Sequence, residues 1–244
     1  MGSIVEQGPL QNIFWKLPYR LRFWLYKTLR RKVFNRMQEL RNISETGYVT
    51  SLKGFDELKC IYIHIPKTGG VSINQRLFNN LGSSHMTIKG CSLIFSKLEF
   101  DSYYKFSVVR NPFDRLASAY FFLKESGFHE KDQQWFSENL SKYNTFQDFV
   151  INWVNKKNVY SSIHFIPQYE FVCINDKLSI DEVFKLEEID AAYKKIARKL
   201  NIKDMTLSKL NAGKNKIDYM ELYDKKSLAI VENIYKKDFV IFDY

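Results

Sequence analysis

The apolar positions of the chain group into short runs and longer periodic stretches. Residues 60–65 and 105–109 are apolar runs rich in β-branched residues, which is typical of buried strands. Each run is followed by apolar residues at helical spacing, over about 72–81 and 114–124. Strands that alternate with helices favour an α/β fold with a central, mainly parallel sheet covered by helices on both sides.

The second half of the chain has a weaker pattern. Helices are expected at about 146–155, 189–200 and 222–237, and a loop leading into a strand at 164–172. Three further stretches are interpreted as a short strand at 84–90, a polar insertion at 125–143 and a loop at 182–184. Right-handed crossovers are expected to bring the carboxyl ends of the first two strands to one edge of the sheet.

The segment from residue 14 to residue 42 has the pattern of an amphipathic helix. Apolar residues recur there at every fourth position, as Leu21, Leu25, Leu29, Val33 and Met37, with Trp24 and Leu40 on or near the same face. Pro18 marks a break or the start of a helix. The first interpretation is a helix that docks this stripe on the core. The expected organisation is therefore a helical extension over residues 1–57 and a main domain over residues 58–244.

Charge changes the view of this extension. The chain has a formal net charge of +10, and residues 14–42 hold nine Lys or Arg and one acid, Glu39. Such a concentration suggests an anionic partner. Peripheral contact with an anionic membrane surface through residues 14–42, contact with an acceptor and a homo-oligomer are the alternatives, whereas a nucleic-acid partner is not expected.

Cysteine usage and hydropathy concern the location of the protein. The three cysteines are widely spaced and fit neither a zinc site nor a redox pair, so buried, reduced thiols are expected. The N-terminal residues lack the pattern of a signal peptide, and no apolar run approaches the ~20 residues of a membrane-spanning helix. These features predict a cytoplasmic protein, with peripheral membrane contact as an option.

The first candidate site is the glycine-bearing loop after the first strand. Residues 66–72 read Pro-Lys-Thr-Gly-Gly-Val-Ser and lead into a helix. Backbone N–H groups, a helix N-terminus and the ammonium of Lys67 then point to one place, which suits a phosphate or sulfate. The lysine precedes the glycines, so the loop lacks the Walker A spacing.

The second candidate site follows the second strand. Residues 110–120 read Arg-Asn-Pro-Phe-Asp-Arg-Leu-Ala-Ser-Ala-Tyr, with Asn111 as a helix N-cap and Pro112 in the first turn. Arg110 and, two turns later, Ser118 are suited to holding a phosphate through charge-assisted hydrogen bonds. Arg115 is expected to pair with an acid.

Together the two motifs resemble those of sulfotransferases that use 3′-phosphoadenosine 5′-phosphosulfate (PAPS), in particular the carbohydrate or uronyl type of family 2 in a soluble, bacterial-like form. The resemblance covers about residues 58–244. It implies a P-loop-like three-layer fold, nucleotide binding, no metal, and transfer of a sulfuryl group to an acceptor hydroxyl, most fittingly on a glycan during polysaccharide biosynthesis. The implied PAPS-binding residues are Lys67, Thr68, Gly69, Gly70, Val71, Ser72, Arg110, Ser118 and Lys214.

Catalysis by this route requires a cation at the leaving oxygens, for which Lys67 is expected, and a base for the acceptor. The resemblance suggests His85 as the base, and neutral imidazole suits that task. His164 is the second candidate, and it and Gln168 belong to a motif near the acceptor site of the family. His64 is expected to be packed in its strand, and His129 to be solvated.

Three other functions compete with glycan sulfation. A small secondary metabolite is an alternative acceptor. A nucleotide-dependent phosphotransferase shares the strand–loop–helix anion site, but the missing Walker A spacing and the lack of an acid suited to Mg2+ after a strand argue against it. A binding module that acts through the basic N-terminal segment is the third alternative.

Overall fold

The computed structural model describes residues 9–125, 127–204, 206–207 and 218–244. Its described residues divide into two compact units. The sheet unit comprises those within Met1–Ile65, Gly69–Val109 and Tyr169–Asn211, and the helical unit those within Pro66–Thr68, Arg110–Gln168 and Ala212–Tyr244. The chain passes through the glycine-bearing loop from the first unit to the second and back.

The centre of the sheet unit is a three-stranded parallel sheet. Its strands β1 (Cys60–Ile63), β2 (Tyr104–Val109) and β5 (Glu182–Lys185) lie in the order β1-β2-β5. All four residues of β1 are buried, as expected for a strand covered on both faces. The predicted α/β fold with a parallel sheet is confirmed.

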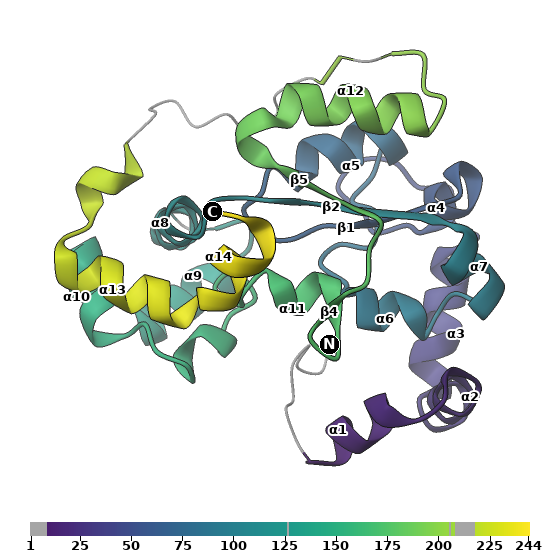
Figure 1. The fold of residues 1–244 in the computed structure, drawn as a ribbon, viewed down its shortest axis with the longest axis horizontal. Helices are drawn as coiled ribbons and strands as arrows, with labels where there is room; N and C mark the ends of the chain where they lie inside the picture. Colours follow the sequence, from purple (N-terminus) through teal and green to yellow (C-terminus); the bar gives the residue numbers. More distant parts are fainter. Residues whose placement is uncertain (1–8, 126, 205, 208–217) are drawn as a thin grey trace. The chain divides into compact units, whose positions relative to one another are not determined.

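Helices cover both sides of this sheet in Figure 1. Helices α5 (Gly70–Phe78) and α12 (Ile189–Lys199) lie on one side, and α6 (Ile88–Ser92) and α11 (Tyr169–Val172) on the other. The unit also contains α4 (Lys53–Leu58), α7 (Lys97–Ser102), a hairpin of β3 (Cys173–Ile174) and β4 (Lys177–Leu178), and a 3-10 turn at Leu186–Glu188. Cys60, Cys91 and Cys173 are all buried in this unit as free thiols, as predicted.

The N-terminal segment consists of three helices instead of one. They are α1 (Pro9–Lys16), α2 (Tyr19–Leu29) and α3 (Arg31–Leu40), with a break at Arg30, whose φ of −113° and ψ of 34° interrupt the helix. The break changes which residues face inward. The predicted docking of the apolar stripe holds only in part. Leu21, Leu29 and Val33 are exposed, Leu25 and Met37 are half-buried, and Leu40 is buried together with Phe34.

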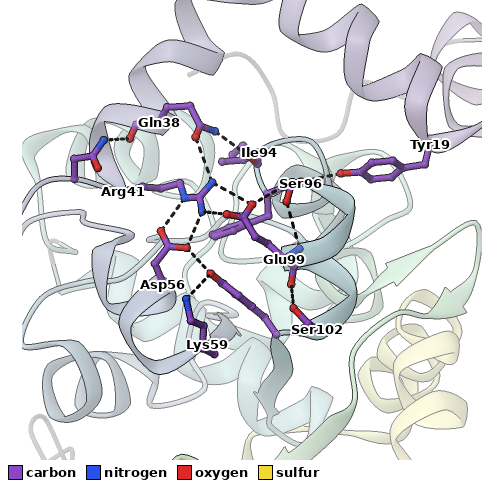
Figure 2. A network of polar contacts seen from close by, with 12 residues as sticks. Tyr19, Gln38, Arg41, Asp56, Lys59, Ile94, Ser96, Glu99 and Ser102 are labelled. Atoms are coloured by element: carbon purple, nitrogen blue, oxygen red, sulfur yellow. Dashed lines mark hydrogen bonds and ion pairs between the residues drawn. The ribbon is translucent and has the colours of Figure 1, made fainter.

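Polar contacts hold the inner side of these helices to the rest of the sheet unit (Figure 2). Arg41, just after α3, donates from Nε and Nη2 to the carboxylate of Asp56 at 2.8 and 2.7 Å, and from Nη2 to Glu99 at 2.6 Å. Gln38 donates to the carbonyl of Ile94 at 2.8 Å. The guanidinium thus bridges α3 to both α4 and α7.

The helical unit is built around an aromatic core. Its helices are α8 (Pro112–Lys124), α9 (Glu130–Asn139), α10 (Phe146–Asn152), α13 (Lys225–Ile234) and α14 (Lys236–Phe242), with short 3-10 turns at Asn158–Tyr160 and Tyr219–Leu222. The ring of Tyr120 stacks on that of Phe149 at 4.7 Å between centroids, and Trp153 lies 5.0 Å from Phe165. Such pairs stabilise the unit beyond simple burial.

Several predicted elements differ in the structure. The strand expected at 84–90 is wrong, because Thr87 accepts a hydrogen bond from the N–H of Gly90 and starts α6. Helix α9 occupies the expected polar insertion. Residues 182–184, expected in a loop, belong to β5. Residues 164–172 were expected to lead from a loop into a strand, but they end in α11, and the short strand β3 follows it. The expected last helix is divided into α13 and α14.

In the described part of the chain, none of the helices combines the length and the apolar character that crossing a bilayer requires.

Candidate active site

The glycine-bearing loop joins β1 to α5, so the predicted order of strand, loop and helix is observed. Lys67 and Gly69 adopt positive φ angles of 70° and 73°, and Gly69 is the N-cap of α5. A lysine in this region of backbone space is unusual and marks a loop whose shape is imposed by its surroundings. Thr68 and Ser72 are buried, whereas Gly69 is exposed and Val71 is half-buried.

Gly70 lies against the ring of His64. A Cβ at position 70 would be 1.9 Å from Cδ2 of His64, far inside van der Waals contact. His64 itself is 5% exposed, and its Nδ1 lies 3.2 Å from the side-chain amide nitrogen of Asn74. As predicted, His64 is packed against its neighbours, and its ring excludes any side chain from the start of α5.

The second motif lies where β2 leads into α8. Asn111 caps the helix by accepting a hydrogen bond from the N–H of Phe113 at 3.0 Å, and Pro112 occupies the first turn, both as predicted. The guanidinium of Arg110 forms two parallel bonds to Asp114, at 2.6 and 2.8 Å. Its third nitrogen, Nη1, donates to the carbonyl of Lys67 at 3.1 Å. Arg110 of the second motif thus contacts Lys67 of the first within the helical unit.

Gln168 fixes the backbone of Arg110. Its Oε1 accepts from the N–H of Arg110 at 3.0 Å, and its Nε2 donates to the carbonyl of the same residue at 2.8 Å. The N–H of Gln168 donates to Asp238 at 2.7 Å, and the side chain is fully buried. These contacts position Arg110, while a contact of Gln168 with an acceptor stays a prediction.

The ammonium of Lys67 lies 3.7 Å from the centroid of the Phe122 ring. Burial, and then the positive charges of Arg110 and Arg115, lower the pKa of Lys67 to about 8. Cations over an aromatic face are attracted by the negative potential of the ring. The lysine is therefore held by a neutral surface, and its charge is not neutralised by an ion pair among the described residues.

His164 packs against the same ring. Its ring centroid is 5.0 Å from that of Phe122, and its Nε2 is 3.7 Å from Oδ1 of Asp132. Burial lowers the pKa of His164, with smaller contributions from Lys67 and Arg115, although Asp132 opposes the shift. The contact with His164, and then the N–H groups of Phe128 and His129, lower the pKa of Asp132 to about 2.

Arg115 is fully enclosed. It donates from Nε to the carbonyl of Pro66 at 2.9 Å and from Nη1 to that of Ile166 at 2.9 Å. Carbonyl groups therefore occupy these two donors, and the acid expected beside Arg115 is not among its hydrogen-bond partners in the described part of the chain. Its Nη2 is buried without a hydrogen-bond partner there, as is Nδ1 of His164. Burying a polar atom without a hydrogen-bond partner lowers the stability of the folded protein, so two such atoms suggest a ligand-binding site more than a core.

His85 belongs to the sheet unit. Its Nδ1 lies 3.1 Å from the carbonyl oxygen of His64. A carbonyl oxygen can only accept, so Nδ1 carries the hydrogen and the neutral ring has its lone pair at Nε2. This contact fixes both the tautomer and the orientation of the ring, as a general base requires.

The other predicted residues are placed as follows. Ser118 is half-buried in α8, and His129 is exposed at the N-terminus of α9, as expected for that histidine. Lys214 lies outside the described residues. Within the described ranges, no group of three or more His, Cys, Asp or Glu side chains is arranged to hold a metal ion.

Comparison with known proteins identifies the family of this chain. The model of the Sulfotransferase family matches residues 53–244, which is most of the chain. The chain belongs to the Sulfotransferase family. Searches of curated proteins and of solved structures gave no match. Membership of this family makes the protein a transferase of sulfuryl groups and agrees with the observed α/β fold.

Two residues of this sulfotransferase's candidate site were missed by sequence reasoning. Phe122 was counted as one more apolar residue of its helix, and Asp132 as part of a polar insertion. Phe122 lies four residues after Ser118, on the same face of α8, so helical spacing was a signal for it. Asp132 had no such signal, because its contact with His164 joins residues 32 positions apart.

Proposed function

We propose that this sulfotransferase transfers the sulfuryl group of PAPS to a hydroxyl group, most fittingly on a glycan, by in-line displacement with a histidine as base. The observation that carries the proposal is the hydrogen bond from Arg110 to the carbonyl of Lys67. It joins two motifs that are 43 positions apart and that each suit an anionic group. PAPS carries a phosphosulfate and a separate 3′-phosphate, so its binding needs two such anion-binding motifs.

The residues of the helical unit fit such a donor. Lys67 is a half-buried cation without a carboxylate ion-pair partner among the described residues, and it would stabilise charge on the leaving oxygens. The unpartnered Nη2 of Arg115 is a buried donor to which an oxyanion would supply an acceptor. Arg110 and Ser118 would hold the 3′-phosphate, and the hydroxyl of Thr68 would bind the phosphosulfate.

The start of α5, in the sheet unit, has donors for an anion of its own, among them the hydroxyl of Ser72. Gly69, Gly70 and Val71 form the first turn at the N-terminus of α5, where unpaired N–H groups and the helix dipole favour negative charge. Transfer of a sulfuryl group spreads charge over its peripheral oxygens, as phosphoryl transfer does. Positioned donors therefore contribute to the rate without taking part in covalent chemistry.

The base is one of two histidines. His85 has a fixed tautomer with its lone pair at Nε2. His164 has a lowered pKa, which favours the neutral form, and an aspartate beside its Nε2. Either ring can take the proton of an acceptor hydroxyl, so variants of both are needed.

Calorimetry tests the donor site. The product nucleotide, 3′-phosphoadenosine 5′-phosphate, is titrated into the protein, with AMP and ATP–Mg as controls. We expect tight binding of the bisphosphate alone, and its loss in Arg110→Ala. Preference for ATP–Mg would overturn the proposal in favour of a phosphotransferase.

An acceptor screen with labelled PAPS tests the chemistry. The histidine variants are His85→Asn and His164→Asn, with the exposed His129→Asn as matched control. We expect one of the first two to lose turnover by about two to four orders of magnitude while still binding the nucleotide. Turnover only with small phenols or alcohols would assign a small-molecule acceptor in place of the glycan.

A further inference from the structure

The outer side of the N-terminal helices is both apolar and basic. Four large apolar residues there are strongly exposed: Leu21 at 43%, Trp24 at 59%, Leu29 at 75% and Val33 at 44%. Helix α2 has no buried residue at all. Exposed single apolar residues are common on proteins, but four within thirteen positions, one of them a tryptophan, form a patch that calls for a partner.

Basic residues lie beside this patch. On α2, Leu21, Trp24 and Thr28 share one face by helical spacing, and Arg20 and Lys27 flank it. Exposed Arg30, Arg31 and Lys32 follow at the start of α3. The single acid of the segment, Glu39, is already paired with Arg36 at 3.5 Å.

The inner side of the same helices is occupied by contacts with the sheet unit, which fixes the side that faces outward. Arg41 is held by Asp56 and Glu99, and Gln38 by the carbonyl of Ile94 (Figure 2). The hydroxyl of Tyr19 donates to the carbonyl of Phe95 at 2.8 Å. The apolar and basic residues therefore remain on the surface and are not a face that turns inward.

We propose that the outer side of α2 and the start of α3 binds an anionic lipid membrane surface. Insertion of Trp24, Leu21 and Leu29 among lipid headgroups buries apolar area, and the flanking Arg and Lys pair with anionic headgroups. A polyanionic glycan or nucleic acid would use the charges but would leave the aliphatic residues in water. The combination of both features favours a bilayer.

Flotation of the full chain with vesicles tests this proposal. Vesicles of phosphatidylcholine alone are compared with vesicles that also contain phosphatidylglycerol. We expect binding to the anionic vesicles, weak binding to the neutral ones, and a decrease as salt is added, because screening shortens the reach of the charges. Equal binding to both vesicles, or to neither, would overturn the proposal.

Two pairs of variants separate charge from apolar contact. Arg20→Glu with Lys27→Glu is expected to weaken vesicle binding roughly tenfold or more, since each basic residue near an anionic surface contributes about fivefold. The matched control is Lys225→Glu with Lys226→Glu, two exposed lysines of α13 in the helical unit. An equal loss of vesicle binding in both pairs would mean that binding depends on the net charge of the protein and not on the surface of α2, and would overturn the proposal.

Tryptophan fluorescence gives a second readout. Trp24 is strongly exposed, whereas Trp15 and Trp153 are buried and Trp135 is half-buried against the core of the helical unit. A shift to shorter wavelength on adding vesicles should therefore come from Trp24. We expect the shift to vanish in Trp24→Phe and to persist in Leu98→Ala, which removes an even more exposed apolar side chain from α7. Binding to heparin with no shift on vesicles would assign a polyanion as the partner and overturn the proposal. A concentration-dependent dimer that buries Trp24 without lipid would overturn it in favour of a second copy.

Discussion

The ammonium of Lys67 packs on the ring of Phe122 at 3.7 Å, in a place where burial and two arginines lower its pKa to about 8. Because no ion pair neutralises this ammonium among the described residues, a nearby anion would stabilise its charged form. Its pKa then becomes a reporter of ligand binding, because an added negative charge favours the protonated form.

The first prediction concerns proton uptake at pH 8. Half of the Lys67 side chains are deprotonated there, so binding of 3′-phosphoadenosine 5′-phosphate should take up about half a proton. Calorimetry in buffers of different ionisation enthalpy measures it. In Lys67→Arg, which keeps its charge, the uptake should disappear. Buffer-independent heats for the parent protein would contradict the assigned environment of Lys67.

The second prediction concerns stability against pH at the same residue. The unfolded chain holds the Lys67 proton up to its usual pKa of 10.5, whereas the folded chain releases it near 8. The free energy of unfolding should therefore rise between these values as pH increases. Lys67→Met should remove this rise and stabilise the protein at pH 7 by about 1–2 kcal/mol. Denaturant unfolding at several pH values measures both effects.

The third prediction concerns Asp132 and His164. Asp132 raises the pKa of His164, so Asp132→Asn should lower that pKa further, as followed by NMR titration of the ring. The variant should also lose roughly 2 kcal/mol of stability that is present above pH 4 and declines toward pH 2, because the pKa of Asp132 is lowered. Glu138→Gln, an exposed change in the same helix, is the control. An unchanged His164 titration would show that the two side chains do not interact.

The fourth prediction concerns Gly70. Gly70→Ala forces a methyl group into the ring of His64 and should cost about 1–3 kcal/mol. Gly90→Ala is the matched control: its Cβ would lie 2.8 Å from Cγ of Met86, a flexible side chain that can shift, and alanine favours a helix. Thermal unfolding compares the two. Combining Gly70→Ala with His64→Ala should cost less than the sum of the single changes, and strict additivity would refute the clash.

The fifth prediction concerns Arg41. Arg41→Ala leaves two part-buried carboxylates, Asp56 and Glu99, without their shared cation and should destabilise the protein by about 2–3 kcal/mol. Arg36→Ala breaks an exposed pair with Glu39 and should change stability by less than about 0.5 kcal/mol. Similar costs for both variants would mean that the bridge in Figure 2 does not hold α3 in place.

Sequence patterns predicted those parts of the fold that depend on interactions between residues close together in the chain. The strand before the glycine-bearing loop, the cap at Asn111 and the parallel sheet follow from patterns within a few residues. The third strand, β5, was missed because Glu182–Lys185 is half-buried and lacks an apolar run. Its place in the sheet depends on pairing with β2, which no local pattern encodes.

The candidate site shows the same division. Lys67 and Arg110 were found from their motifs, but their contact depends on how the chain folds between them. Gln168 was found as a candidate for the acceptor, whereas its burial under the backbone of Arg110 follows from tertiary packing. Sequence thus identified the residue types, and the structure identified which of them touch.

The buried thiols have a practical consequence. Burial raises the pKa of Cys60 and that of Cys91, to about 12 for the latter, and Cys173 is 3% exposed. Alkylating reagents attack the thiolate, so all three should react slowly in the folded protein. A cysteine introduced on the outer side of α2 would then take a fluorophore or spin label selectively, without prior removal of the native cysteines.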